Sequence, residues 1–144
     1  MRVFVGRVFV GIVLVLVSTS IPALAVGSSL PYSRGGLVTL FEPIVQQYNQ
    51  SGEQFRIEGR CQSACTMFLG IRNVCVVRSA VLAFHAAHDR HGNIRPTNTA
   101  IMMNTYNAKL RAYLVAHHSL ETVTFTTISG RDIISRFGYR ECPR

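Results

Sequence analysis

The chain has 144 residues, of which 48% are hydrophobic and 15% charged, and its 15 Lys and Arg against 7 Asp and Glu give a formal net charge of +8. This length is typical of one domain, and the charged fraction lies below the roughly 25% of ordinary soluble domains. A disordered polyelectrolyte is therefore excluded, because such chains combine low hydrophobicity with high charge.

The first 25 residues have the pattern of a secretory signal peptide. Arg2 and Arg7 make a basic start, residues 8–17 are almost entirely apolar, and Ala23-Leu24-Ala25 offers a small-residue cleavage site. The alternative is a retained membrane anchor, which would need about 20 apolar residues, whereas this run is broken by Ser, Thr and Pro. Cleavage after Ala25 predicts an exported protein, periplasmic or secreted, with no membrane span left and a single domain over residues 26–144.

Arginine dominates the positive charge of the expected mature chain. Loss of Arg2 and Arg7 leaves 13 basic residues against 7 acidic ones, a net charge of +6, and Lys109 is the only lysine. The arginines are spread from Arg34 to Arg144 with no dense run and no interleaved aromatic residues. A nucleic-acid-binding surface would cluster them. We therefore interpret them as a solvated basic surface and expect no nucleic-acid partner.

The mature chain is expected to begin with an irregular segment over residues 26–34. From Gly36 onward, apolar residues recur at every third or fourth position. This period predicts an amphipathic helix that runs to about Asn49 and is stopped at Ser51-Gly52.

A group of short strands follows this helix. Alternation of apolar and polar residues predicts a strand over residues 54–58. Residues 59–63 are interpreted as a turn, and residues 64–69 as a short buried helix that ends at a glycine. Apolar, β-branched runs predict two further strands over residues 74–77 and 81–84.

The last part of the chain is expected to be mainly helical. We predict a polar loop over residues 88–98, a helix over residues 100–117, and a short helix over residues 129–137 capped by Gly138. Residues 121–127 are ambiguous. Helices that alternate with short buried strands indicate an α/β layered fold with parallel strands.

Three features of this layout point to acyl-transfer chemistry. Gly35-Gly36 opens a helix, where free backbone N–H groups suit an oxyanion. Ser63 lies at a strand-to-helix turn, and His85 closes a later strand. A nucleophilic serine needs a neighbouring base, which a histidine in this place could supply. The alternatives are a simple turn, a helix N-cap and a buried core histidine.

Together these segments resemble the Clp protease proteolytic subunit and its relatives in the ClpP/crotonase superfamily. SRGG at 33–36 is similar to the family's S-P-G-G helix start, GRCQSAC at 59–65 to its nucleophile segment, and VVRSAVLAFH at 76–85 to the strand that ends in its catalytic histidine. The similarity is greater to an exported bacterial branch with C-x-S-A-C and F-H motifs. It extends, with less specific motifs, to LVAHHSLE at 114–121 and FGY at 137–139.

The resemblance implies a fold and a set of roles. Ser63 would be the nucleophile and His85 the general base, and the backbone N–H groups of Gly36 and Ala64 would form the oxyanion hole, each donor contributing roughly 3 kcal/mol to transition-state stabilisation. The substrate would be a peptide or an acyl compound, and no cofactor is expected. The alternative is an inactive ClpP-like envelope protein that binds a peptide, an acyl ligand or a protein partner.

Three departures from the family pattern matter. Arg34 replaces the proline, and the family's strands before the glycine pair are missing, so the fold is expected to be truncated and its sheet completed by another copy of the chain. The third catalytic residue is open. Alignment on the helix end gives Thr126, alignment on the closing turn gives Glu121, and Asp132 is a further candidate.

The four cysteines, at positions 61, 65, 75 and 142, all follow the signal peptide. In an oxidising compartment an even number indicates two disulfides, with three possible connectivities. We expect Cys75 to pair with Cys61 or Cys65 and Cys142 with the other. Cys61-x-x-x-Cys65 lacks the spacing of a zinc motif. His85, His88 and His91 could bind a metal, but they share a segment with Gly92 and Pro96, so we favour a polar loop and expect no metal site.

Overall fold

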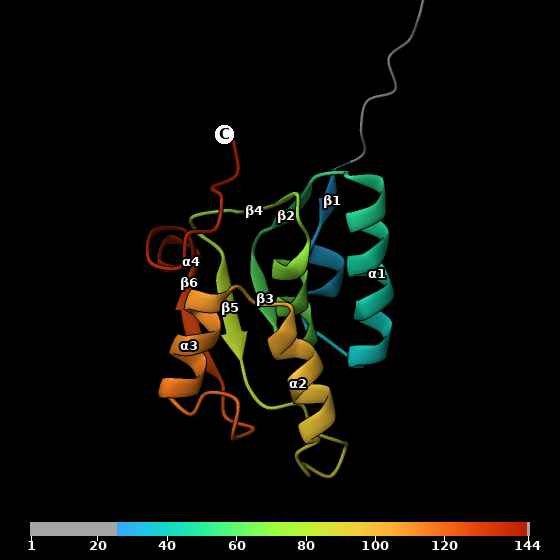
Figure 1. Cartoon of the computed structure of the whole chain (residues 1–144), viewed down its shortest axis with the longest axis vertical. Coiled ribbons are helices and arrows are strands. Elements are labelled where there is room, and N and C mark those ends of the chain that lie inside the picture. The colour runs from blue at the N-terminus through green and yellow to red at the C-terminus, as the bar shows by residue number, and fades with distance from the viewer. Residues whose placement is uncertain (1–25, 144) are drawn as a thin grey trace, which may run out of the picture.

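The structure is a computed structural model that describes residues 26–143 (Figure 1). The signal peptide expected over residues 1–25 lies outside the described residues. The strands form two three-stranded sheets, ordered β1-β2-β4 and β3-β5-β6. In chain order the elements are β1 (Gly27–Ser28), the 3-10 helix η1 (Leu30–Tyr32), α1 (Val38–Ser51), β2 (Phe55–Ile57), β3 (Arg60–Gln62), the 3-10 helix η2 (Ser63–Gly70), β4 (Val74–Val76), β5 (Val81–Phe84), α2 (Pro96–Asn104), α3 (Ala108–Ala116), β6 (Thr126–Ser129) and α4 (Gly130–Ser135).

The chain passes twice from the first sheet to the second. β2 continues into β3 through Gly59, which takes a positive φ of 62°, and β4 continues into β5. Both continuations run in the same direction, so β2 pairs with β4 and β3 pairs with β5 in parallel. Of the strands within residues 26–143, β6 is the one that runs antiparallel to its neighbour. The prediction of a mixed α/β fold with short parallel strands is therefore confirmed.

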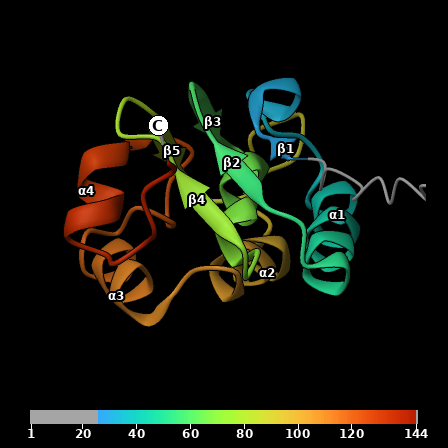
Figure 2. The same cartoon turned by 90° about the horizontal axis from the view of Figure 1, so that it is seen from above.

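The helix η2 forms the centre of the molecule. All six residues from Ala64 to Leu69 are buried, which explains why five of them are apolar and why the segment has no polar face. α1 and α2 pack against it. The centre of the Phe68 ring lies 4.4 Å from that of Phe55 and 5.3 Å from that of Phe41. Viewed from above, α1 lies at one end of the fold and α3 and α4 at the other (Figure 2).

The predictions from hydrophobic periodicity are confirmed for α1, β2, β4, β5 and the buried helix η2. Two others are wrong. Residues 59–63 contain the strand β3 instead of a turn, and residues 26–34 contain β1 and η1 instead of an irregular segment. β1 pairs with β2, so this short start of the chain occupies an edge of the first sheet.

The single helix predicted over residues 100–117 is also wrong, because the structure has two helices there. α2 begins earlier, with Pro96 in its first turn, where proline is favoured. The chain then breaks before Asn107, whose side-chain oxygen accepts a hydrogen bond from the Leu110 N–H and so caps α3. Among residues 26–143, none of the helices has the length and apolar character needed to cross a bilayer.

The structure contains two disulfides, as predicted, but their pairing differs from the expected one. Cys61 is bonded to Cys65, and Cys75 to Cys142. The second bond forms because the C-terminal segment runs alongside β4, where the Cys142 N–H donates to the Val76 carbonyl at 3.0 Å. This contact places Cys142 beside Cys75, with 4.8 Å between their Cα atoms.

Candidate active site

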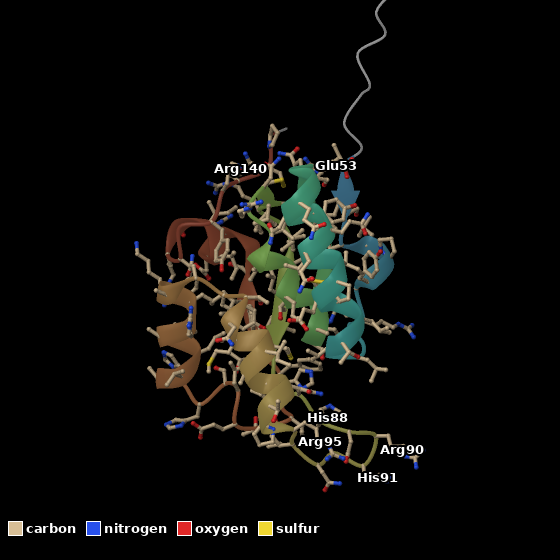
Figure 3. The ribbon with its side chains drawn as sticks, turned by 45° about the vertical axis from the view of Figure 1, so that its right-hand side comes forward. Glu53, His88, Arg90, His91, Arg95 and Arg140 are labelled. Carbon is tan, nitrogen blue, oxygen red and sulfur yellow. A yellow bond between two sulfur atoms is a disulfide. The ribbon has the colours of Figure 1, made fainter. Side chains whose placement is uncertain are left out.

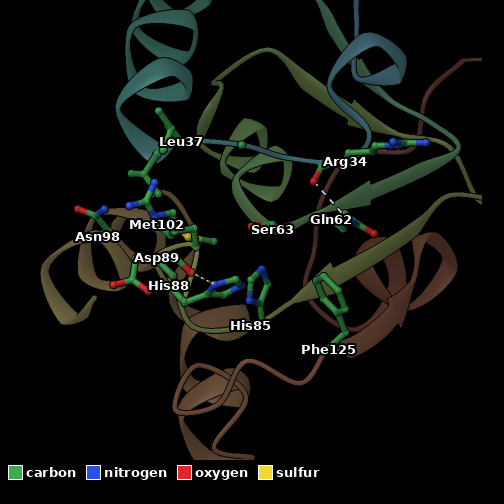
Figure 4. A pocket seen from close by; sticks show the side chains of 14 residues that line it. Arg34, Leu37, Gln62, Ser63, His85, His88, Asp89, Asn98, Met102 and Phe125 are labelled. Atoms are coloured by element: carbon green, nitrogen blue, oxygen red, sulfur yellow. Dashed lines mark hydrogen bonds between the residues drawn. The ribbon is translucent and has the colours of Figure 1, made fainter. Parts of the chain in front are cut away.

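Ser63 and His85 are brought together by the pairing of β3 with β5. Gln62, the last residue of β3, is in register with Ala83, and Ser63 and His85 are the first residues beyond the two strands. Adjacent parallel strands lie about 4.8 Å apart, so their carboxyl ends deliver both side chains to one edge. There the two residues line a cavity of about 430 Å³ (Figure 4).

Ser63 occupies an unusual backbone conformation, with a positive φ of 56°. Such conformations are rare for residues other than glycine and persist where the surroundings enforce them, often at functional sites. A half-buried serine on a sharp turn between a strand and a helix has its hydroxyl presented at the helix N-terminus. This local geometry fits a nucleophile better than a helix N-cap.

Two buried hydroxyls hold the carbonyl of Ser63. The Thr66 hydroxyl donates to that carbonyl at 2.7 Å and lies 2.6 Å from the Tyr106 hydroxyl. A threonine hydroxyl has a single hydrogen, so Tyr106 is the donor in the second bond. Burial raises the pKa of Tyr106, which keeps this donor protonated at all ordinary pH values.

The glycine pair lies against the Ser63 turn. Gly35 has a positive φ of 73°, and a Cβ atom there would lie 2.6 Å from the Gln62 carbonyl oxygen and 2.8 Å from the Ser63 Cβ. Gly36 lines the cavity. Within residues 26–143, the N–H groups of Gly36 and Ala64 donate to no backbone carbonyl. Only Gly36 lines the cavity, whereas Ala64 is completely buried behind Gly35.

His85 is buried, with 4% of its surface exposed, yet neither ring nitrogen has a hydrogen-bond partner in the described structure. Its ring lies 4.6 Å from Phe125 and 5.1 Å from His88. Burial, and secondarily the charge of His88, lower the pKa of His85 below its usual 6.5, although the adjacent Ala86 backbone opposes this lowering. His85 is therefore neutral at pH 7 and has the form that a general base requires.

None of the three candidates for the third catalytic residue is bonded to His85, since both of its ring nitrogens are free. Glu121 pairs with His118 at 3.0 Å in an exposed position. Asp132 lies in the first turn of α4, where it accepts from the Ser129 hydroxyl at 3.0 Å. Thr126 is the first residue of β6 and pairs with Phe84. Among residues 26–143, no acid is hydrogen-bonded to His85 to orient it toward Ser63.

Several residues that the sequence did not single out complete the cavity wall. Leu37, at the start of α1, has 68% of its surface exposed, and Met102 of α2 and Phe125 add further apolar surface. Gln62 and Asn98 supply side-chain amides. Arg34, Asp89 and Arg90 also line the cavity, so charged side chains of both signs lie beside these apolar and amide groups. A lining that combines apolar surface with polar groups suits an acyl or peptide group.

The loop that carries His88 and His91 is organised by Asp89. This carboxylate accepts from the Asn93 side chain and from the backbone N–H groups of His91 and Asn93, and it forms an ion pair with Arg95 at 2.7 Å. These contacts, those of Asn93 first, lower its pKa to about 2. His88 and His91 lie at the end of the molecule (Figure 3). Within residues 26–143, no group of three His, Cys, Asp or Glu side chains is placed to hold a metal ion.

Comparison with known proteins adds no family to this picture. No protein-family model matches the chain, and no curated protein is significantly similar to it.

Proposed function

We propose that the chain is an exported serine hydrolase of peptides or acyl compounds, built on a shortened ClpP/crotonase-like fold. The observation that carries the proposal is the buried, neutral and unpartnered His85 beside Ser63, at the ends of two paired parallel strands. The positive φ of Ser63 and the Gly36 N–H, which lines the cavity and donates to no backbone carbonyl, support the same function. The signal-peptide pattern and the two disulfides support export.

The proposed reaction uses only groups of this chain. The Ser63 oxygen attacks the substrate carbonyl while His85 accepts its proton, and the Gly36 and Ala64 N–H groups bind the oxyanion. His85 then protonates the leaving group. In the second half, water attacks the acyl carbon while His85 accepts its proton, and His85 returns that proton to the Ser63 oxygen as the acid is released. The hydrogen bond between Ser63 and His85 forms when substrate closes the site, since catalytic hydrogen bonds often tighten only in the complex.

One observation favours a second function, that of an inactive relative which binds a peptide, an acyl ligand or a protein partner. His85 has no acid to fix its tautomer or stabilise its positive charge, and loss of that partner weakens serine hydrolases greatly. The cavity would then retain its shape and its free N–H groups as a binding site. Reactivity of Ser63 separates the two functions.

A fluorophosphonate probe should label the folded, oxidised protein at Ser63, because the probe reports a serine activated by a base and an oxyanion hole. Ser63→Ala should abolish labelling and change the free energy of unfolding by less than about 1 kcal/mol. Ser135→Ala, which removes an exposed helix hydroxyl bonded to Arg131, serves as the matched control and should label normally. Mass spectrometry locates the adduct. An unlabelled wild-type protein, beside a labelled known serine hydrolase, would support the inactive binder.

The rate of labelling should depend on pH with a midpoint below 6.5. His85 acts as a base only when neutral, and its pKa is lowered by burial and by His88, so the rate should be high at pH 7 and fall as pH drops through the lowered pKa. His88→Gln removes the smaller cause, so its midpoint should move upward while remaining below 6.5, because burial persists. A wild-type midpoint at or above 6.5 would contradict the assignment of His85 as the base.

A further inference from the structure

The disulfide between Cys61 and Cys65 encloses Ser63. Cys61 is the central residue of β3, Cys65 lies in the first turn of η2, and Ser63 is midway between them. Both cysteines are completely buried, and their Cα atoms lie 5.3 Å apart. The bond therefore links the strand that leads into the Ser63 turn directly to the helix that leaves it.

The Ser63 turn needs such a link because its backbone conformation is unfavourable. A left-handed conformation persists at a serine only where surrounding groups enforce it. Gly35 packs against one side of the turn, and the Thr66 hydroxyl holds the Ser63 carbonyl. These contacts restrain Ser63 itself, whereas the disulfide fixes the separation of the two segments on either side of it.

We infer that the Cys61–Cys65 disulfide is a positioning element of the active site, which holds Ser63 in its reactive conformation. This inference rests on the proposed function and adds a condition to it: only protein in which this bond has formed is reactive. The site would thus be assembled in an oxidising compartment and remain unformed in a reducing one.

The second disulfide provides a matched control within the same chain. Cys75 lies in β4 of the other sheet, and its bond to Cys142 closes a loop of 67 residues, against 4 for the first bond. Loss of a long-loop disulfide destabilises a protein more than loss of a short-loop one. Loss of the Cys75–Cys142 bond should therefore lower stability more, whereas loss of the Cys61–Cys65 bond should lower reactivity more.

The test compares Cys61→Ala/Cys65→Ala with Cys75→Ala/Cys142→Ala, by fluorophosphonate labelling rate and by thermal unfolding. The first variant should label about 100-fold more slowly, the cost of misplacing a reactive group by about 1 Å, while its melting temperature falls less than that of the second. The second should label within about threefold of the wild-type rate at a temperature where it is folded. The residual labelling of the first variant should lose the pH dependence set by His85.

Reduction of the wild-type protein gives a second measurement that needs no variant. Dithiothreitol transfers two electrons and two protons to each disulfide, which becomes two thiols while the reagent becomes its cyclic disulfide. Alkylation and mass spectrometry count which bonds are open, and circular dichroism gives the folded fraction. Labelling should fall with the opening of Cys61–Cys65 and be insensitive to the opening of Cys75–Cys142.

A wild-type protein that does not label overturns the proposed function and this inference with it. A wild-type protein that labels, together with a Cys61→Ala/Cys65→Ala variant that labels at the same rate, overturns the inference alone. Labelling that falls only in proportion to the folded fraction, in both the variant and the reduction experiment, also overturns it, because the bond would then act on stability and not on position.

Discussion

Gly35→Ala should destabilise the protein and remove most of its reactivity toward a fluorophosphonate. The added Cβ would lie 2.6 Å from the Gln62 carbonyl oxygen, 2.8 Å from the Ser63 Cβ and 3.0 Å from the Ala64 nitrogen, and two of these three are backbone atoms. Backbone atoms cannot swing aside as the end of a side chain can. The turn must therefore move, and with it the Ser63 hydroxyl and the Ala64 N–H.

The size of the effect has two parts. A non-glycine residue at φ of 73° costs about 1–2 kcal/mol. Overpacking against a fixed neighbour adds about 1–3 kcal/mol. We expect the labelling rate to fall about 100-fold as well, because the clash displaces the reacting group itself.

Gly52→Ala separates these two parts. Gly52 follows α1 with nearly the same φ, 72°, but a Cβ atom there would meet nothing within 4 Å. This variant should lose only the about 1–2 kcal/mol that a non-glycine residue costs at a positive φ. It should label at the wild-type rate. Urea denaturation measures the first effect and probe kinetics the second. Equal losses of stability in the two variants, with labelling intact in both, would show that the close approach of Gly35 to Ser63 has no role.

The sequence predicts the parts of the fold that carry a local signal. The period of apolar residues in α1 and the apolar runs of β4 and β5 reflect burial that each segment achieves against one common core. The glycine pair, Ser63 and His85 are also visible in the sequence, because each is marked by its place at the end of an element. Their meeting in one cavity follows from the parallel pairing of β3 with β5.

β3 itself has no such signal. Of its three residues only Cys61 is buried, and a single apolar residue between two polar ones is too short a pattern to indicate a strand. The strand exists because its backbone pairs with β5, a segment about twenty residues away, and because Gly59 turns the chain into it. Tertiary pairing of this kind overrides local propensity.

The residues around the nucleophile depend equally on distant contacts. Tyr106 falls within the single helix predicted over residues 100–117 but lies in the break between α2 and α3. Its hydroxyl reaches Thr66, 40 residues away, and so supports the Ser63 carbonyl. Phe125 lies in a segment without periodicity and packs edge-on against His85. The disulfide pairing is a third case, since it was decided by the course of the C-terminal segment beside β4 and not by spacing.

Cys75→Ala/Cys142→Ala should lower the free energy of unfolding by about 4 kcal/mol, the effect expected for a disulfide that closes a loop of 67 residues. Whole domains of this size are stable by only about 5–15 kcal/mol, so the melting temperature should fall by about 15 °C. Loss of Cys61–Cys65 should cost about 2 kcal/mol, because its loop is short.

Glu141→Ala is the control for this variant, because it weakens the same C-terminal segment without touching the disulfide. Glu141 forms an exposed ion pair with Arg78 at 2.8 Å, and such pairs contribute less than about 1 kcal/mol. Urea denaturation of the three proteins measures the difference, and the slope of each transition reveals any change in the unfolded state. A disulfide variant no less stable than Glu141→Ala would show that the Cys75–Cys142 bond contributes little to stability. The hydrogen bonds between the C-terminal segment and Val76 would then be sufficient to hold that segment in place.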